Sequence, residues 1–153
     1  MFKTQSLVGK CPLRSCIIHA ADCRFDIGEL YAQAGIRPDQ LSFVQTYDDY
    51  PVIVMMQLED LGFCAKGEAP DFVRAHDLTI AGDFPHNTSG GQLSAGQAGA
   101  AGGYLGLVEA MRQLTNTAGG TQVANARTAL VSGFGMINYD RGLCTSATIL
   151  AAA

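Results

Sequence analysis

Residues 87–114, with the sequence NTSGGQLSAGQAGAAGGYLGLVEAMRQL, decide the fold of this chain. The segment begins as a loop rich in Gly and Ser and continues as a predicted helix with almost no charge. Glycines stand where an ordinary surface helix would carry Lys, Glu or Ala: Gly96, Gly99, Gly102, Gly103 and Gly106. Because each Gly inside a helix costs about 0.5–1 kcal/mol relative to Ala, other backbones are expected to approach this helix closely. We therefore predict a buried central helix, too short in apolar length to span a membrane.

The N-terminal end of the predicted helix is suited to hold a negatively charged oxygen. The first N–H groups of a helix have no partner inside the helix. A helix N-terminus therefore attracts an anion or an oxyanion. The segment combines a buried helix with a polar opening.

The composition of the 153-residue chain indicates one globular domain. A formal net charge of −4, with 16% charged residues, argues against nucleic-acid binding, which needs a basic patch. No run of apolar residues is long enough to cross a bilayer, so we expect no membrane span. Residues 1–10 contain neither an apolar signal segment nor a small-residue cleavage site, so the sequence predicts a cytoplasmic protein.

The cysteines are five in number and irregularly spaced: Cys11, Cys16, Cys23, Cys64 and Cys144. No Cys-x-x-Cys pair exists, so we expect no metal site. Free thiols in a reducing compartment are the simplest interpretation. Any of them can serve as a small buried hydrophobic residue, and only Cys144 also has a catalytic interpretation.

Helical and strand patterns alternate along the chain. Helices are predicted at 26–34, ended by Gly35 and Pro38, and at 52–61, begun by Pro51. The predicted strands are 13–20, 41–46, 127–132 and 145–151. The connecting segments are an N-terminal arm at 1–12, a long loop at 65–86 with a short strand at 78–80, and a surface connection at 115–126. This alternation predicts an α/β fold.

The Gly-rich segment resembles the signature of a known enzyme family. NTSGGQLSAGQAGAAGG is similar to the thiolase pattern of Asn-x-x-Gly-Gly followed by Gly-His-Pro-x-Gly and a central buried helix. Two positions differ, because Gln97 and Ala98 replace the His and the Pro of that pattern. AGIRPDQLSFVQTYDDYP and LGFCAKGEAPDFV also resemble thiolase stretches, so the likeness covers roughly the last 120 residues. Within the family, the chain looks most like the C-terminal half of a lipid-transfer or sterol-carrier type of thiolase.

The resemblance implies a fold and an activity. The fold would be a thiolase-like α/β/α layer over residues 13–153, with a mixed, about five-stranded sheet and the buried Gly-rich helix. The activity would be that of an acyltransferase that makes or breaks a carbon–carbon bond of a coenzyme A thioester, with no cofactor bound by this chain. Retro-aldol cleavage of a CoA-ester side chain and a non-catalytic structural subunit are the alternatives.

The resemblance also implies partners. In thiolases the nucleophilic Cys belongs to the N-terminal half, which no segment here matches. Another polypeptide would supply that half, unless the chain is a fragment, and a second copy of the chain would complete a homo-oligomer. Relatives of this type often pair with a small OB-fold, zinc-ribbon protein, which is a further expected partner.

Three predicted loops would converge on one pocket if the resemblance holds: 47–50, 87–97 and 133–144. The implied substrate-binding residues are Asn87, Ser89, Gly90, Gly91, Gly96, Gly133 and Gly135.

Two residues of the first loop are candidate catalytic groups. Tyr47 occupies a position that in thiolases helps to hold a donor at the thioester oxygen, and a phenol can donate to an oxyanion. Alternatively, Tyr47 is an ordinary loop tyrosine that anchors a turn. Asp49 follows Asp48, and like charges in a closed site raise the pKa of one carboxylate, which would make a general base. Alternatively, the two aspartates are turn and cap residues.

Gln97 and Cys144 are the candidates in the other two loops. Gln97 can donate an N–H to an oxyanion but cannot take up a proton at neutral pH, so the usual thiolase route is not expected. Cys144, in the run GLCTSA, lies near the place where thiolases carry a second, acid/base cysteine. A thiolate needs a lowered pKa for this role, and Arg141 is the obvious nearby cation.

Overall fold

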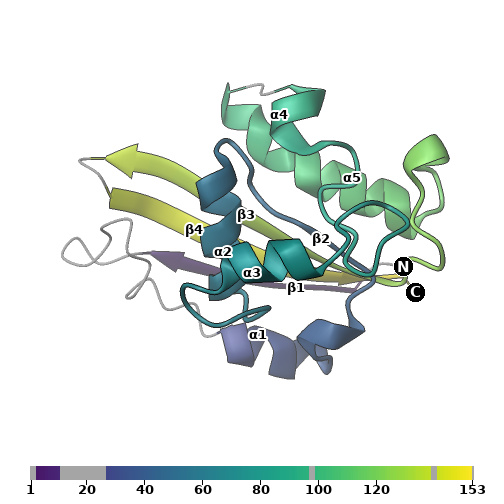
Figure 1. The fold of residues 1–153 in the computed structure, drawn as a ribbon, viewed down its shortest axis with the longest axis horizontal. Coiled ribbons are helices and arrows are strands. Elements are labelled where there is room, and N and C mark those ends of the chain that lie inside the picture. Colours follow the sequence, from purple (N-terminus) through teal and green to yellow (C-terminus); the bar gives the residue numbers. More distant parts are fainter. Residues whose placement is uncertain (1–2, 11–26, 97–98, 139–140, 153) are drawn as a thin grey trace.

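The computed structural model describes residues 3–10, 27–96, 99–138 and 141–152 (Figure 1). Their centre is a four-stranded sheet in the order β1-β4-β3-β2. The strands are β1 (Lys3–Lys10), β2 (Phe43–Gln45), β3 (Thr128–Asn138) and β4 (Arg141–Ala151). β1 and β3 are both antiparallel to β4, whereas β2 is parallel to β3, so the sheet is mixed as expected. The described residues thus form four strands where about five are predicted, and the predicted strand at 13–20 lies outside them.

The N-terminal segment forms part of the sheet. The sequence predicts an arm over residues 1–12, but Lys3–Lys10 pair with β4 along their whole length, from Lys3 opposite Ala151 to Lys10 opposite Cys144. The prediction of an arm is wrong for these residues. Their pairing partner lies at the other end of the chain, so no local pattern marks them as a strand.

The prediction of a loop at 133–144 is also wrong. β3 continues to Asn138 and β4 begins at Arg141, so Gly133, Gly135 and Cys144 all lie in strands. Gly135 faces Cys144 across the ladder. Glycines weaken a strand by about 1 kcal/mol or less each, and an antiparallel ladder of this length compensates for that cost.

Helices cover both faces of the sheet. α1 (Ile27–Ala34) and α5 (Leu105–Leu114) lie on opposite sides of it (Figure 1). The core on the α1 side contains Leu30, Tyr31, Val44, Leu61, Leu130, Ala147 and Ile149. The core on the α5 side contains Phe43, Ala110, Leu114, Val123, Ala126, Ala129, Val131 and Leu150. Neighbouring residues of β2, β3 and β4 point to opposite cores, and the result is the predicted α/β/α layer.

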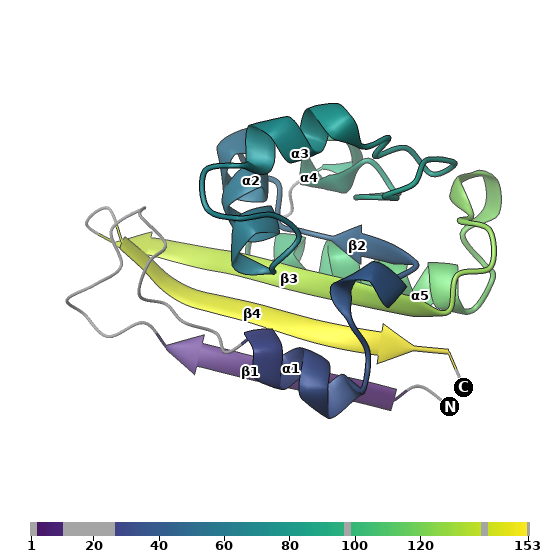
Figure 2. The same cartoon turned by 60° about the horizontal axis from the view of Figure 1, so that its bottom comes forward.

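The remaining helices are α2 (Pro51–Asp60), α3 (Ala69–Ala75) and α4 (Gly91–Ala95), with 3-10 turns at Pro38–Gln40, Gly99–Tyr104 and Gly119–Thr121. α2 and α3 lie together above one end of β2 (Figure 2). α3 falls inside the segment predicted as a long loop. An aromatic cluster holds this segment together, because the Phe84 ring makes edge-on contacts with Phe63 and Phe72 at centroid distances of 4.9 and 5.0 Å.

The Gly-rich helix differs from the prediction in continuity and burial. It consists of α4, the turn at Gly99–Tyr104 and α5, and Gly96 ends α4 with a φ of +102°. The close approach to a strand occurs at Gly106, where an added Cβ would lie 3.2 Å from Cβ of Gln45. Its other side is open: the exposed apolar side chains are Leu93, Tyr104, Val108 and Met111. In this chain the helix is therefore buried on one side only.

Candidate active site

The loop after β2 is held by Gln57, which lies in the second turn of α2. The N–H of Tyr47 donates to Oε1 of Gln57 at 3.1 Å, and Nε2 of Gln57 donates to the carbonyl of Tyr47 at 2.6 Å. The hydroxyl of Ser132 donates to the same Gln57 oxygen at 2.7 Å. Because Gln57 is buried and bonded on both sides of Tyr47, it fixes the backbone that carries the half-buried Tyr47 side chain.

The Gly-rich loop lies directly against this first loop. The N–H of Thr46 donates to Oδ1 of Asn87 at 2.9 Å, and the N–H of Asn87 donates to the carbonyl of Val44 at 3.0 Å. Asn87 has a φ of +44°, a conformation that Asn tolerates better than most residues. The structure thus places the loop that contains Tyr47 and Asp49 against the segment that contains Asn87, Ser89, Gly90 and Gly91.

A buried carboxylate joins the two loops at a second point. Oδ1 of Asp48 accepts the N–H of Gln92 at 2.7 Å. Gly91 has a φ of +63°, and a Cβ added to it would lie 2.0 Å from Oδ2 of Asp48. Only glycine fits there. Sequence reasoning singled out Asp49, but the carboxylate tied to the Gly-rich loop is its neighbour, and no local signal separates the two aspartates.

His86 lies beside these contacts, with Nε2 2.7 Å from Oγ1 of Thr46. Burial lowers the pKa of His86 to about 4, and the negative charge of Asp48 opposes this effect only partly. The imidazole is therefore neutral near pH 7. It acts as a hydrogen-bonding partner of Thr46, and it does not serve as an imidazolium acid at that pH.

Gln92 carries an unsatisfied acceptor. Its Oε1 is the side-chain atom of the described residues that is buried without a hydrogen-bond partner. An unpaired buried acceptor costs about 1–3 kcal/mol. This oxygen is therefore suited to accept a donor that the described residues do not supply.

The other predicted site residues lie in strands or outside the described chain. Gly133, Gly135 and Cys144 belong to the β3–β4 hairpin. Gln97 lies outside the described residues, so its role stays a prediction. Within the described ranges, no three His, Cys, Asp or Glu side chains gather as metal ligands, and no helix is long and apolar enough to cross a membrane.

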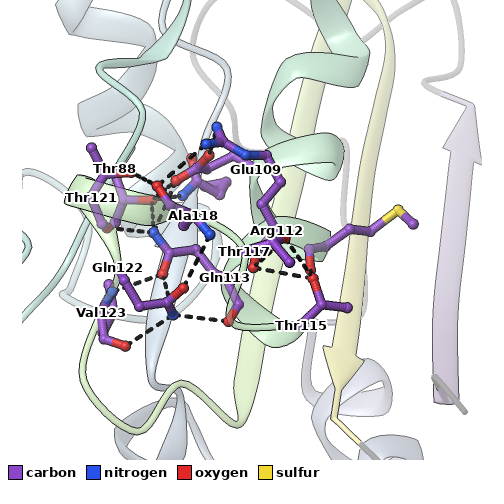
Figure 3. Close-up of polar contacts among 12 residues, drawn as sticks. Thr88, Glu109, Arg112, Gln113, Thr115, Thr117, Ala118, Thr121, Gln122 and Val123 are labelled. Atoms are coloured by element: carbon purple, nitrogen blue, oxygen red, sulfur yellow. Dashed lines mark hydrogen bonds and ion pairs between the residues drawn. The ribbon is translucent and has the colours of Figure 1, made fainter.

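Sequence reasoning missed a buried polar network under the Gly-rich loop. It centres on Thr88 and Glu109, which are both buried (Figure 3). One signal was available, because Glu109 is the single acidic residue of residues 87–114. A buried carboxylate in a helix with so few charges needs partners.

A known family matches most of this chain, including both loops. The model of the family described as thiolase C-terminal domain-like matches residues 28–147. The chain belongs to this family. The resemblance to the C-terminal half of a thiolase-superfamily protein is therefore confirmed.

Several thiolase-like proteins are similar to this chain. The steroid side-chain-cleaving aldolase of Thermomonospora curvata is 43% identical over 89 residues, which are 58% of this chain and 22% of that protein. The 17-hydroxy-3-oxo-4-pregnene-20-carboxyl-CoA lyase of Mycobacterium tuberculosis is 39% identical over 89 residues, with the same coverage. A solved structure named Ltp2-ChsH2(DUF35) aldolase matches 96% of this chain and 38% of its own, with 35% identity and a TM-score of 0.78. The chain thus spans well under half the length of these relatives.

Proposed function

We propose that this chain is the C-terminal half of a thiolase-like enzyme that cleaves the side chain of a coenzyme A ester by a retro-aldol reaction. The similarity to an aldolase and a CoA lyase, at 43% and 39% identity, supports this reaction. The broader activity, making or breaking a carbon–carbon bond of an acyl-CoA thioester, includes the acyltransferase reaction that the resemblance first implied.

The chemistry of a retro-aldol step suits the residues of this chain. A base removes the proton of the β-hydroxyl, the Cα–Cβ bond breaks, and Cβ becomes a carbonyl carbon. The electron pair passes to Cα and the thioester oxygen as an enolate, which is then protonated at Cα. No acyl-enzyme forms, so the reaction needs neither a nucleophilic Cys nor a proton-accepting His at the position of Gln97.

Tyr47 and the Gly-rich loop would stabilise the enolate. Gln57 holds the backbone of Tyr47 on both sides, and Asp48 and Thr46 tie its loop to Gln92 and Asn87. Preorganised donors of this kind lower the barrier because they need no rearrangement as charge develops. Asp49 or Cys144 would handle the protons, and Gln97 would donate to the thioester oxygen.

The exposed side of the Gly-rich helix is evidence for a protein partner. Tyr104, Val108 and Met111 are spaced along one helix face and are 65%, 52% and 46% exposed. We infer that the N-terminal half of the thiolase-like unit covers this face, because the relatives are much longer than this chain. An oligomer and a small OB-fold, zinc-ribbon protein complete the proposed assembly. The name of the solved relative likewise joins Ltp2 with ChsH2(DUF35).

The test compares two tyrosines of the same loop in a complex with an N-terminal-half polypeptide. Tyr47→Phe should lower the rate of carbonyl release from a β-hydroxyacyl-CoA by about 10²–10³, because one oxyanion donor is lost. Tyr50→Phe is the matched control: Tyr50 is 61% exposed, and this variant should keep the rate. Gln97→Ala should cause a loss similar to that of Tyr47→Phe.

Two results would contradict the proposal. If the wild-type complex releases no carbonyl product from such thioesters, the retro-aldol activity is wrong. If the complex is active and Tyr47→Phe releases the carbonyl product at the wild-type rate, Tyr47 has no part in the reaction. Activity that survives both Tyr47→Phe and Gln97→Ala favours a structural role for this chain.

A further inference from the structure

Thr88 is the centre of a buried hydrogen-bond network that is separate from the contacts between the two loops. Its hydroxyl lies 2.8 Å from Oε1 of Glu109 (Figure 3). The same oxygen of Thr88 accepts Nε2–H of Gln45 at 3.0 Å and of Gln113 at 3.1 Å. Gln45, Glu109 and Gln113 are at most 2% exposed. Thr88 thereby joins the Gly-rich loop to both β2 and α5.

The chemistry of these groups sets the direction of the bond between Thr88 and Glu109. Nε2 of Gln45 can only donate, so it occupies a lone pair of the Thr88 hydroxyl. The two protons of Gln113 Nε2 are shared among Thr88, Oε1 of Glu109 at 2.9 Å and the carbonyl of Thr121 at 2.7 Å. The Thr88 proton must then go to Glu109, whose carboxylate only accepts. The second oxygen of Glu109 accepts a bond from the partly exposed Arg112 at 3.0 Å, which offsets the buried negative charge.

The network holds the loop from beneath, between two other anchors. Asn87 is held by the N–H of Thr46, and Gln92 is held by Asp48. Thr88 adds the anchor nearest to Ser89 and Gly90, whose backbone would face the substrate. Three anchors on different elements leave this short segment little freedom to move.

We propose that Thr88 and Glu109 are positioning residues that set the backbone of residues 89–91 for the thioester oxygen. This inference rests on the proposed function, because it concerns the same site. Neither side chain touches the reacting atoms. Their effect passes through the loop backbone, where a small displacement of oxyanion donors costs much of the rate.

The first test measures amide hydrogen exchange and does not depend on the reaction. Thr88→Val should raise the exchange rate of the amides at Gly90–Gln92 by about tenfold or more, while amides of α1 exchange as in the wild type. Thr88→Ser restores the hydroxyl and should return the rate to within about twofold of the wild type. Thr117→Val is the control, because it removes an exposed threonine hydroxyl beyond the end of α5.

Two exchange results would overturn the proposal. One is an amide exchange rate at Gly90–Gln92 in Thr88→Val that equals the wild-type rate. The other is faster exchange by the same factor throughout the chain, which indicates general destabilisation. If Thr88→Val does not fold, Gln45→Met removes one donor to the same hydroxyl, and loop exchange unchanged in that variant overturns the proposal.

The second test measures kinetics in the complex. Thr88→Val should lower kcat by about tenfold or more with KM within about threefold, and Thr88→Ser should recover most of kcat. Faster loop exchange with unchanged kcat would overturn the positioning role and leave only a structural one. If the wild-type complex has no activity on CoA thioesters, the proposed function fails. The exchange result then still decides whether the network orders the loop.

Discussion

Replacing Gly91 with alanine tests how the two loops of the candidate site are joined. Gly91 has a φ of +63°, and its Cβ position lies 2.0 Å from Oδ2 and 2.8 Å from Oδ1 of Asp48. An alanine methyl group cannot occupy this place while the carboxylate stays. The substitution therefore strains the backbone and also displaces the buried acceptor of the Gln92 N–H.

The two costs can be separated with a second glycine. A left-handed conformation costs a residue with a Cβ about 1–2 kcal/mol. Losing the bond between Gln92 N–H and the buried carboxylate of Asp48 adds about 1–3 kcal/mol. Gly119 has nearly the same φ, +65°, and nothing lies within 4 Å of its Cβ position. Gly119→Ala therefore carries the strain alone, and Gly91→Ala should destabilise the protein by about 2–5 kcal/mol in total.

The measurement is the free energy of unfolding in urea, at one protein concentration for all variants because assembly would shift it. In an Asp48→Ala background the carboxylate is absent, so adding Gly91→Ala should cost no more than Gly119→Ala. The reasoning is refuted if Gly91→Ala and Gly119→Ala differ by less than about 0.5 kcal/mol. It is also refuted if the Asp48→Ala background leaves the cost of Gly91→Ala unchanged.

Three further predictions concern other parts of the chain. Burial lowers the pKa of His86 from 6.5 to about 4, so the unfolded chain binds this proton more tightly than the folded protein does. The free energy of unfolding should therefore fall by at most about 3 kcal/mol as the pH falls from about 6.5 to about 4. Urea titrations should show this decrease in the wild type and not in His86→Gln. Gly106→Ala should lower the melting temperature because its Cβ would crowd β2 and β3, whereas Gly103→Ala, with nothing within 4 Å, should leave it unchanged or raise it. The chain alone should self-associate or bind a hydrophobic dye, and Val108→Ser with Met111→Ser should reduce both; a monodisperse monomer by light scattering for the wild type would contradict this.

Local patterns determined the elements whose signals lie in adjacent residues. The helix predicted at 26–34 forms as Ile27–Ala34, and Gly35 ends it with a φ of +69°. Pro51 is the first residue of α2, as its position after the loop indicated. The Gly-rich segment and two shorter stretches carried the family resemblance, because glycine spacing and helix starts are properties of consecutive residues.

Only the tertiary structure decided the contacts between residues that are far apart in the chain. Asp48 and Gln92 are 44 positions apart, and Thr88 and Glu109 are 21 apart. Nothing near Asp48 in the sequence shows that it, and not Asp49, meets the Gly-rich loop. Likewise, residues 3–10 become a strand only because β4 offers them unpaired backbone groups. These outcomes depend on strand order and on which side chains the sheet brings together, which is long-range information that no window of the sequence contains.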